Sequence, residues 1–280
     1  MKYTVLHPMT LLDALQALAP ASSKTTLRSW LKDGRVQLNG KEVKIASTPV
    51  EAGQLVTVGA KEKHLPKGVQ ILYEDKHLIA IIKPEGLLSV ATLFEKGLTA
   101  HTIIKEYVHP RKVYVVHRLD QDTSGVMLFA FTDEAYKGLK SIFEKHAIDR
   151  EYTAVVEGHL ESLSGSWSCY LYEDEKYHVH ATDDPEKGEY AITHYEVRKQ
   201  NPKYTLLNLK LETGKKNQIR VHCQEAGHPV SGDKKYGAEH APLRRLCLHA
   251  HLLAFTHPVT KKEMRFEAPA PQGFFKLVRR

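Results

Sequence analysis

The segment His117-Arg118-Leu119-Asp120-Gln121-Asp122-Thr123-Ser124-Gly125 lies between two short apolar runs, at 113–116 and 126–131. Both runs have the length and the aliphatic and aromatic content of β-strands. The second is apolar throughout, as is typical of a strand buried on both faces. A carboxylate between two buried strands cannot be freely hydrated, so it needs a partner or a chemical task. The sequence therefore predicts a rigidly held polar site centred on Asp120.

The overall composition is that of an ordinary globular protein. The chain has 280 residues, of which 42% are hydrophobic and 26% charged, enough for a large core and two domains. Its apolar runs fall short of the ~20 residues that a transmembrane helix needs. The N-terminus lacks the apolar stretch of a signal peptide. We expect a cytoplasmic protein, and we expect it to be a monomer.

The cysteines, histidines and charges narrow the possible chemistry. The 3 cysteines show no CxxC spacing, which argues against a disulfide framework and against a zinc site. The 17 histidines show no HExxH spacing, so no metal site is expected. A net charge of +7 suits a polyanionic partner.

The segment 117–125 closely resembles the HRLD-x-x-TSG signature of the RluA-type pseudouridine synthases, which isomerise uridines in RNA without a metal or a cofactor. The resemblance implies that Asp120 is the nucleophile, which must be ionised to react. It also implies that Arg118 takes the place of the extruded uridine in the RNA stack. We group His117 with the substrate-binding residues and interpret it as a residue that braces the loop by hydrogen bonding rather than as a base. The alternative is an Asp that caps a turn beside a surface arginine.

Two further blocks resemble the same family. Residues 150–158 match the block whose tyrosine, here Tyr152, lies beside the catalytic Asp, stacks on the base and moves a proton. Residues 212–222 match the block usually written ETGRTHQIRVH. This match implies that Arg220 pairs with Asp120 and keeps it ionised, and that Ile219 forms an apolar wall.

The chain departs from the last block at three positions. Lys215, Lys216 and Asn217 stand where Arg, Thr and His are usual, which leaves open any phosphate contact there. Asparagine is a good N-cap residue, so we expect Asn217 to cap a helix that runs to Ala226 and is closed by Gly227.

The first 60 residues have the pattern of a separate small module. Leucines at helical spacing predict one helix, Thr25 or Thr26 is expected to cap a second, and Asn39-Gly40 is a hairpin signal. This pattern, with the stretch SWLKDGRVQLNGKEV, resembles an S4 RNA-binding domain over Met9–Val58. Six of its basic residues form a cluster that would hold RNA phosphates without reading sequence: Lys24, Arg28, Lys32, Arg35, Lys41 and Lys44.

The resemblances imply the domain organisation and the fold class. We expect an S4-like domain at 1–60, a polar linker at 61–70 and a pseudouridine synthase catalytic domain at 71–280. The fold class is α+β: a mixed, largely antiparallel sheet with flanking helices, preceded by the small S4-like α/β domain. The polar segment 161–190 is predicted to be a loop or a loose hairpin.

The function implied by the resemblance is that of an RNA pseudouridine synthase. Members with an S4 domain mostly modify large-subunit ribosomal RNA, so this is the leading substrate and tRNA is the alternative. A catalytically silent RNA-binding assembly factor is the rival from another class, although the Asp, Tyr and Arg are all present. Whether Asp120 attacks C1′ or C6 of the uridine, or promotes a glycal, stays open, as does the identity of the modified uridine.

Overall fold

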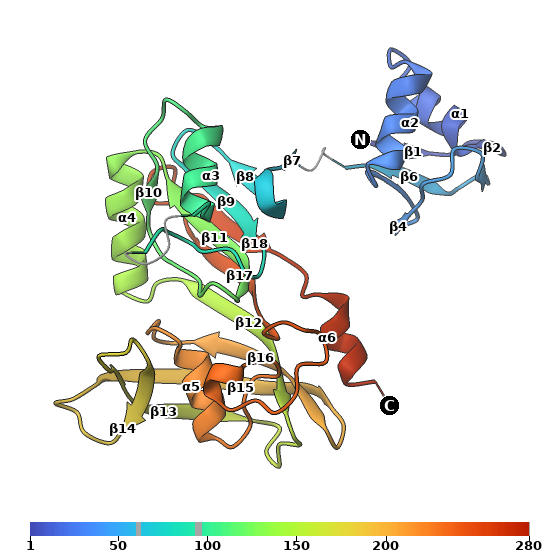
Figure 1. Ribbon diagram of the computed structural model, residues 1–280. Helices are drawn as coiled ribbons and strands as arrows, with labels where there is room; N and C mark the ends of the chain where they lie inside the picture. The colour runs from blue at the N-terminus through green and yellow to red at the C-terminus, as the bar shows by residue number, and fades with distance from the viewer. Residues whose placement is uncertain (60–62, 93–96, 280) are drawn as a thin grey trace. The chain divides into compact units, whose positions relative to one another are not determined.

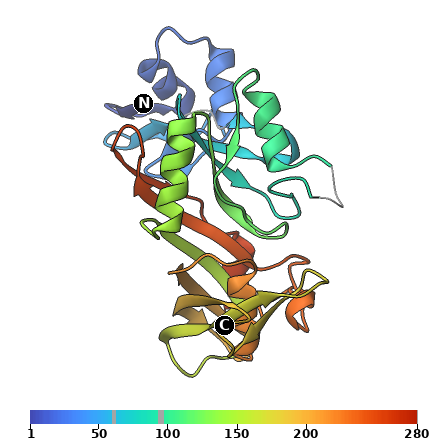
Figure 2. The same cartoon turned by 90° about the vertical axis from the view of Figure 1, so that its left-hand side faces the viewer.

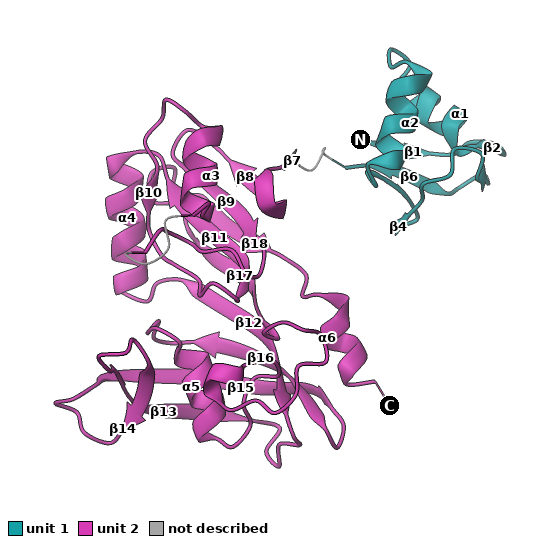
Figure 3. Ribbon diagram, in the orientation of Figure 1, with its two compact units in different colours: residues 1–63 teal, residues 64–280 magenta. Residues whose placement is uncertain are grey.

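The computed structural model describes residues 1–59, 63–92 and 97–279 of the chain. The chain divides into two compact units, Met1–Lys63 and His64–Arg280, which have different colours in Figure 3. Lys61 and Glu62, at the start of the expected linker 61–70, lie outside the described residues. The domain boundaries at 60 and 71 stay predictions. No helix in the described ranges is long and apolar enough to cross a membrane.

The first unit packs two helices against small sheets. Its helices are α1 (Leu11–Leu18) and α2 (Lys24–Lys32), and its strands are β1 (Lys2–Thr4), β2 (Met9–Thr10), β3 (Val36–Leu38), β4 (Lys41–Glu42), β5 (Pro49–Val50) and β6 (Leu55–Val58). One sheet has the order β1-β6-β3-β4, and β2 pairs with β5. Leucines at positions 11, 15, 27 and 31 face a shared core, each at most 2% exposed. The periodic leucines therefore act as the sequence predicts.

Two local predictions in this unit have different outcomes. Asn39 and Gly40 have φ values of 50° and 79°, as a two-residue hairpin turn requires, so the turn is confirmed. The predicted cap at Thr25 or Thr26 is wrong. Ser23 caps α2 instead, because its hydroxyl accepts the backbone N–H of Thr26 at 3.2 Å. Serine and threonine are both good caps, so the sequence alone does not separate the three positions.

The second unit is built on one twelve-stranded sheet with the order β14-β13-β15-β16-β12-β17-β11-β9-β8-β7, in which β10 also pairs with β11 and β18 with β17. The strands are β7 (Lys63–His64), β8 (Gln70–Glu74), β9 (Leu78–Lys83), β10 (Tyr114–Val115), β11 (Ser124–Ala130), β12 (Asp149–Glu157), β13 (Ser164–Glu173), β14 (Val179–Thr182), β15 (Glu189–Gln200), β16 (Tyr204–Leu211), β17 (Leu248–Thr256) and β18 (Glu263–Glu267). The helices are α3 (Ala100–Tyr107), α4 (Asp133–Glu144), α5 (Gln218–Glu225) and α6 (Gln272–Leu277), with 3-10 turns η1 (Pro66–Gly68) and η2 (Lys234–Tyr236). β11 and β17 pair in parallel, whereas β9 beside β11 and β12 beside β17 pair antiparallel. The expected mixed, largely antiparallel sheet with helices is confirmed.

The strand that follows the signature segment lies inside this sheet. All residues of β11 are buried, as the apolar run predicts. Gly125 has φ 126°, and a Cβ at this position would lie 2.2 Å from the carbonyl oxygen of Ala250. Only glycine allows β11 to approach β17 this closely. Gly125, the last residue of the signature segment, therefore fixes the pairing of β11 with β17 five residues after Asp120.

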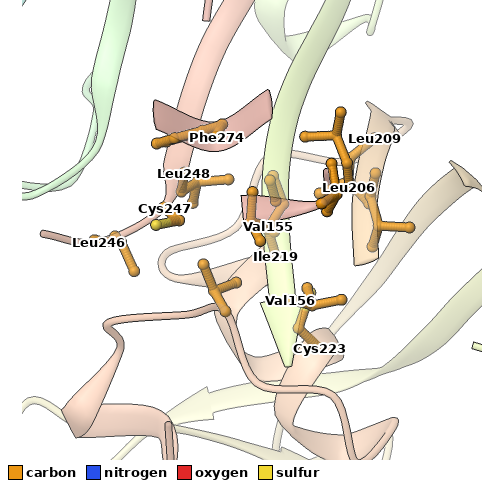
Figure 4. Close-up of a cluster of buried hydrophobic side chains, with 14 of the residues drawn as sticks. Val155, Val156, Leu206, Leu209, Ile219, Cys223, Leu246, Cys247, Leu248 and Phe274 are labelled. Carbon is orange, nitrogen blue, oxygen red and sulfur yellow. The ribbon is translucent and has the colours of Figure 1, made fainter. Parts of the chain in front are cut away.

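A large apolar cluster holds α5 on the sheet. Val155, Leu209 and Leu248 from three strands pack around Ile219 and Cys223 of α5 (Figure 4). In Figures 1 and 2, β12 and β17 run between the part of the unit that contains α3 and α4 and the part that contains α5. Residues carried by β12 and by α5 can therefore meet near the middle of the unit.

The segment 161–190 is more regular than its composition indicates. β13 and β14 pair antiparallel, so the hairpin is formed and the loop alternative is wrong. β14 is the edge strand, and much of β13 is exposed. A strand with few buried positions needs no apolar alternation, so the pattern that reveals most strands is weak there.

Candidate active site

A cavity of about 780 Å³ opens in the second unit where the signature segment, β12 and α5 meet. Its lining includes six residues that the sequence places at the site: His117, Arg118, Asp120, Tyr152, Ile219 and Arg220. The structure thus brings side chains that are more than a hundred positions apart in the chain into one cavity.

The Asp120 carboxylate is half-buried and has two partners. The side-chain amide of Asn217 donates a hydrogen bond to Oδ2 of Asp120 at 2.6 Å. Nη1 of Arg220 lies 3.4 Å from the same oxygen. The amide and the guanidinium thus hold one oxygen of the carboxylate in place beside the cavity.

Arg220 has a closer partner that the sequence interpretation missed. Its Nε and Nη2 donate to the two carboxylate oxygens of Asp233 at 2.6 and 2.7 Å, and Asp233 is only 2% exposed. Burial lowers the pKa of Arg220, but the hydrogen bonds and charge of Asp233 outweigh it and raise the pKa above its ordinary value. The expected pairing of Arg220 with Asp120 alone is therefore incomplete. The bidentate pair with Asp233 is what fixes the guanidinium.

Asn217 also differs from its prediction. It precedes α5 in the left-handed conformation, with φ 52°, and its side chain makes no capping bond. Its amide instead donates to Asp120, and its carbonyl oxygen accepts the hydroxyl of the fully buried Tyr236 at 3.2 Å. The predicted cap is wrong because the side chain is turned toward the cavity. Asparagine tolerates the left-handed region better than most residues, which suits this position.

Tyr152 and Ile219 form apolar parts of the cavity. Ile219 is 5% exposed, consistent with the expected wall. Burial raises the pKa of Tyr152 to about 12, the positive charge of Arg150 opposes the rise, and Asp120 adds to it. The phenol is therefore protonated at neutral pH. It can stack and donate a hydrogen bond, but it is not a base until its own proton has moved.

His117 and Arg118 differ in their contacts and in their exposure to solvent. Nε2 of His117 accepts the backbone N–H of Leu128 at 2.9 Å, and its ring stacks on Phe143 with centroids 4.7 Å apart. Burial, with a contribution from Arg150, lowers the pKa of His117 to about 3, so the ring is neutral. These contacts agree with a bracing residue. Arg118 is exposed and lines the cavity.

Arg35 differs from the basic residues of α2 in how free its side chain is. Lys24, Arg28 and Lys32 are exposed and spaced four residues apart, so they follow one face of α2. Arg35 is half-buried, lies 5.0 Å from the ring centroid of Trp30, and donates from Nε to the carbonyl of Gly59. Its guanidinium is thus partly committed to its own unit, and the other three form the better phosphate-binding stripe.

The buried histidines make the stability of the second unit sensitive to acid. Burial lowers the pKa of His117 to about 3, and those of His222 and His249 to about 4, whereas an unfolded histidine titrates near 6.5. As the pH falls below about 6.5, the unfolded chain takes up protons that the folded chain does not. The free energy of unfolding should then fall by about 1.4 kcal/mol per pH unit for each such histidine.

Thermal melts from pH 7 to 5 check this expectation. His222→Gln should make the decline shallower by about one proton, while replacement of the exposed His159 by Gln should not change it. A melting temperature that stays constant as the pH falls to 5 would contradict the neutral state of these buried rings.

The comparisons with known proteins identify the family of this chain. A human protein named RNA Pseudouridylate Synthase Domain Containing 4 has a similar fold, with a TM-score of 0.60, 24% identity, and coverage of 73% of this chain and 90% of that one. The model of the RNA pseudouridylate synthase family matches residues 77–225, and that of the S4 domain matches residues 9–56. The chain belongs to the RNA pseudouridine synthase family.

The relatives of this pseudouridine synthase align over most of its length. An uncharacterized RNA pseudouridine synthase of Bacillus subtilis is 33% identical over 270 residues, which cover 91% of this chain and 88% of that protein. The ribosomal large subunit pseudouridine synthase D of Escherichia coli K12 is 31% identical over 290 residues, with coverage of 95% and 88%. This synthase is therefore an isomerase that acts on RNA and carries an S4 domain.

Proposed function

We propose that this synthase isomerises uridines in large-subunit ribosomal RNA, with Asp120 as its nucleophile. The observation that carries the proposal is the Asp120 carboxylate, which faces a cavity between a cation, an amide and a neutral phenol. A silent assembly factor has no need for this arrangement. The choice of large-subunit RNA rests on the relatives named for it and on the S4 domain. A cytoplasmic location and a monomeric state are part of the proposal.

The reaction divides among the residues as follows. In the net reaction the bond between C1′ and N1 of the uridine breaks, the base turns, a bond forms between C1′ and C5, C5 loses its proton and N1 gains one. Asp120 supplies the electron pair, either for attack on C1′ or C6 or for promoting a glycal, and any bond that it forms to the nucleotide breaks again before the product leaves. Tyr152 and Ile219 enclose the base and exclude water. Arg118, an exposed planar cation at the cavity, would fill the gap that the extruded uridine leaves in the RNA, and so offset an unstacking cost of a few kcal/mol.

The function is tested with purified protein and RNA labelled with tritium at C5 of uridine. Release of tritium from transcripts of large-subunit ribosomal RNA, with pseudouridine mapped at a fixed position, is the expected result. Modification of tRNA instead would replace the proposed substrate. No release from either RNA, with tight binding retained, would favour the silent assembly factor.

The stripe on α2 should supply affinity rather than chemistry. Replacing Lys24, Arg28 and Lys32 by Gln removes three exposed charges, and each lost phosphate contact should flatten the dependence of log K on log salt by about 0.7–0.9. Turnover of a short, saturating RNA should not change. The matched control is Lys44→Gln, since Lys44 is exposed but already pairs with Glu42 at 3.1 Å. Equal salt slopes for the triple variant and the wild type would exclude the stripe from RNA contact.

A further inference from the structure

Arg150 of β12 is a buried cation with few partners. Its side chain lines the active-site cavity, although the residue is only 7% exposed. Nη2 donates to the backbone carbonyl of Glu212 at 3.2 Å, and Nε is buried without a hydrogen-bond partner. Within the described ranges, no carboxylate forms an ion pair with it.

Lys83 and Arg220, the other buried Lys and Arg side chains among the described residues of this unit, have more hydrogen bonds than Arg150. Nζ of Lys83 donates to three backbone carbonyls, those of Pro84, Leu87 and Gln121, at 2.7–2.9 Å. Arg220 holds Asp233 through two hydrogen bonds and also contacts Asp120. Burial of a charge without a counter-charge is costly, so a cation left in this state beside a cavity points to a partner that arrives with the substrate.

The space around Arg150 is shaped to hold its guanidinium. A Cβ on Gly214 would lie 2.2 Å from Nη1 of Arg150, so the absence of a side chain at this position makes room for the group. The aromatic ring of Phe143 lies beneath it, with the centroid 6.0 Å away. His117 lies close by and is neutral, so it does not compete with Arg150 for an anion.

We propose that Arg150 binds a phosphate oxygen of the target nucleotide while the base of that nucleotide occupies the cavity. The inference rests on the proposed function. An arginine is always charged at neutral pH, and a full counter-charge offsets its burial better than a neutral carbonyl does. Uracil is neutral, whereas each RNA phosphate carries a negative charge. Arg150 and Tyr152 are two residues apart on β12, about 6.6 Å, so one side chain can reach the phosphate while the other stacks on the base.

A structural role and a phosphate-binding role of Arg150 predict opposite effects of Arg150→Met on the melting temperature. If Arg150 serves the fold, Arg150→Met should lower the melting temperature, because packing and a hydrogen bond are lost. If Arg150 waits for substrate, the same variant should melt at the same temperature or higher, because an uncompensated charge is removed. Tritium release from the RNA substrate should fall at least tenfold both in Arg150→Met, which removes the charge, and in Arg150→Lys, which keeps the charge but loses the planar group. The loss should be smaller in Arg150→Lys.

The phosphate is tested by binding of small probes, which does not depend on turnover. Uridine 3′-monophosphate and uridine 5′-monophosphate are compared with uridine by NMR titration of the wild type, Arg150→Met and Gly214→Ala. We expect one monophosphate to bind the wild type at least tenfold more tightly than uridine does, with a shift of the Arg150 Nε–H signal. This preference should disappear in Arg150→Met and weaken in Gly214→Ala. Arg198→Gln is the control, since Arg198 is exposed, pairs with Glu196 and lies outside the cavity.

The outcomes separate this inference from the function on which it rests. A phosphate preference that persists in Arg150→Met overturns the inference, as does equal loss of uridine and monophosphate binding, which would assign Arg150 to the base. Absence of tritium release by the wild type, with the phosphate preference intact, would instead count against the proposed function alone.

Discussion

Replacement of Asp120 by Asn should reduce turnover to below about 1% of the wild-type rate while the fold and RNA affinity persist. The substitution removes the nucleophile's charge and keeps its shape, and loss of covalent attack should raise the barrier by about 3 kcal/mol or more. The fold should tolerate the change, because Arg220 keeps its bidentate bond to the buried Asp233. The side-chain carbonyl of an asparagine can still accept the amide of Asn217.

Tritium release measures the loss, and RNA binding with thermal melting verifies that the variant is folded. Asp122→Asn is a matched control, because Asp122 is an exposed carboxylate two residues along the same segment and also lines the cavity. The control should keep most of the activity. Residual turnover above about 1% for Asp120→Asn would remove Asp120 from the role of nucleophile.

Arg220→Ala should destabilise the second unit by about 3–5 kcal/mol, because it leaves the Asp233 carboxylate buried without a counter-charge. In a unit of this size the melting temperature should drop by about 6–20 °C. Activity should fall as well, since the cation next to Asp120 is lost. Arg220→Lys should recover only part of both, because an ammonium group cannot form the two parallel bonds to Asp233.

A double-mutant cycle identifies the partner that matters for stability. Asp233→Asn added to Arg220→Ala should be more stable than Arg220→Ala alone, because the orphaned charge is gone. Asp120→Asn added to Arg220→Ala should restore less, because Asp120 is half-buried and also bonded to Asn217. Arg198→Ala, which breaks an exposed pair with Glu196, should cost about 1 kcal/mol or less. Strictly additive shifts for Arg220 and Asp233 would show that the pair is not coupled.

Much of the fold could be predicted because its strongest signals are local. The apolar run after the signature segment and the turn at Asn39-Gly40 depend on neighbouring residues only, and both are as expected. The hairpin β13–β14 was less visible, because an edge position demands few buried side chains. The alternation of apolar and polar residues that reveals a strand is weaker where the strand faces solvent on both sides.

The residues of the candidate site also differ in how far they could be predicted from the sequence. Asp120, Tyr152 and Arg220 lie in long motifs, and the structure places all three at one cavity. Asp233 and Arg150 could not be assigned in the same way, because their importance depends on which group a distant loop or strand sets beside them. Asn217 has a recognisable position, but its capping propensity and its left-handed backbone favour different side-chain directions. The sequence shows that Asn217 departs from the family motif, but not that its side chain bonds to Asp120.

The parallel contact between β11 and β17 also has a consequence for how the protein comes to be active. Ser124 of β11 pairs with His249 of β17, 125 positions later in the chain. Loop closure over such a separation is slow, and on a ribosome it cannot begin until the later strand has been synthesised. The strand that follows Asp120 therefore lacks this neighbour until the residues between β11 and β17 have been synthesised. A nascent chain that ends before β17 should bind RNA through its first unit while still lacking an assembled catalytic centre.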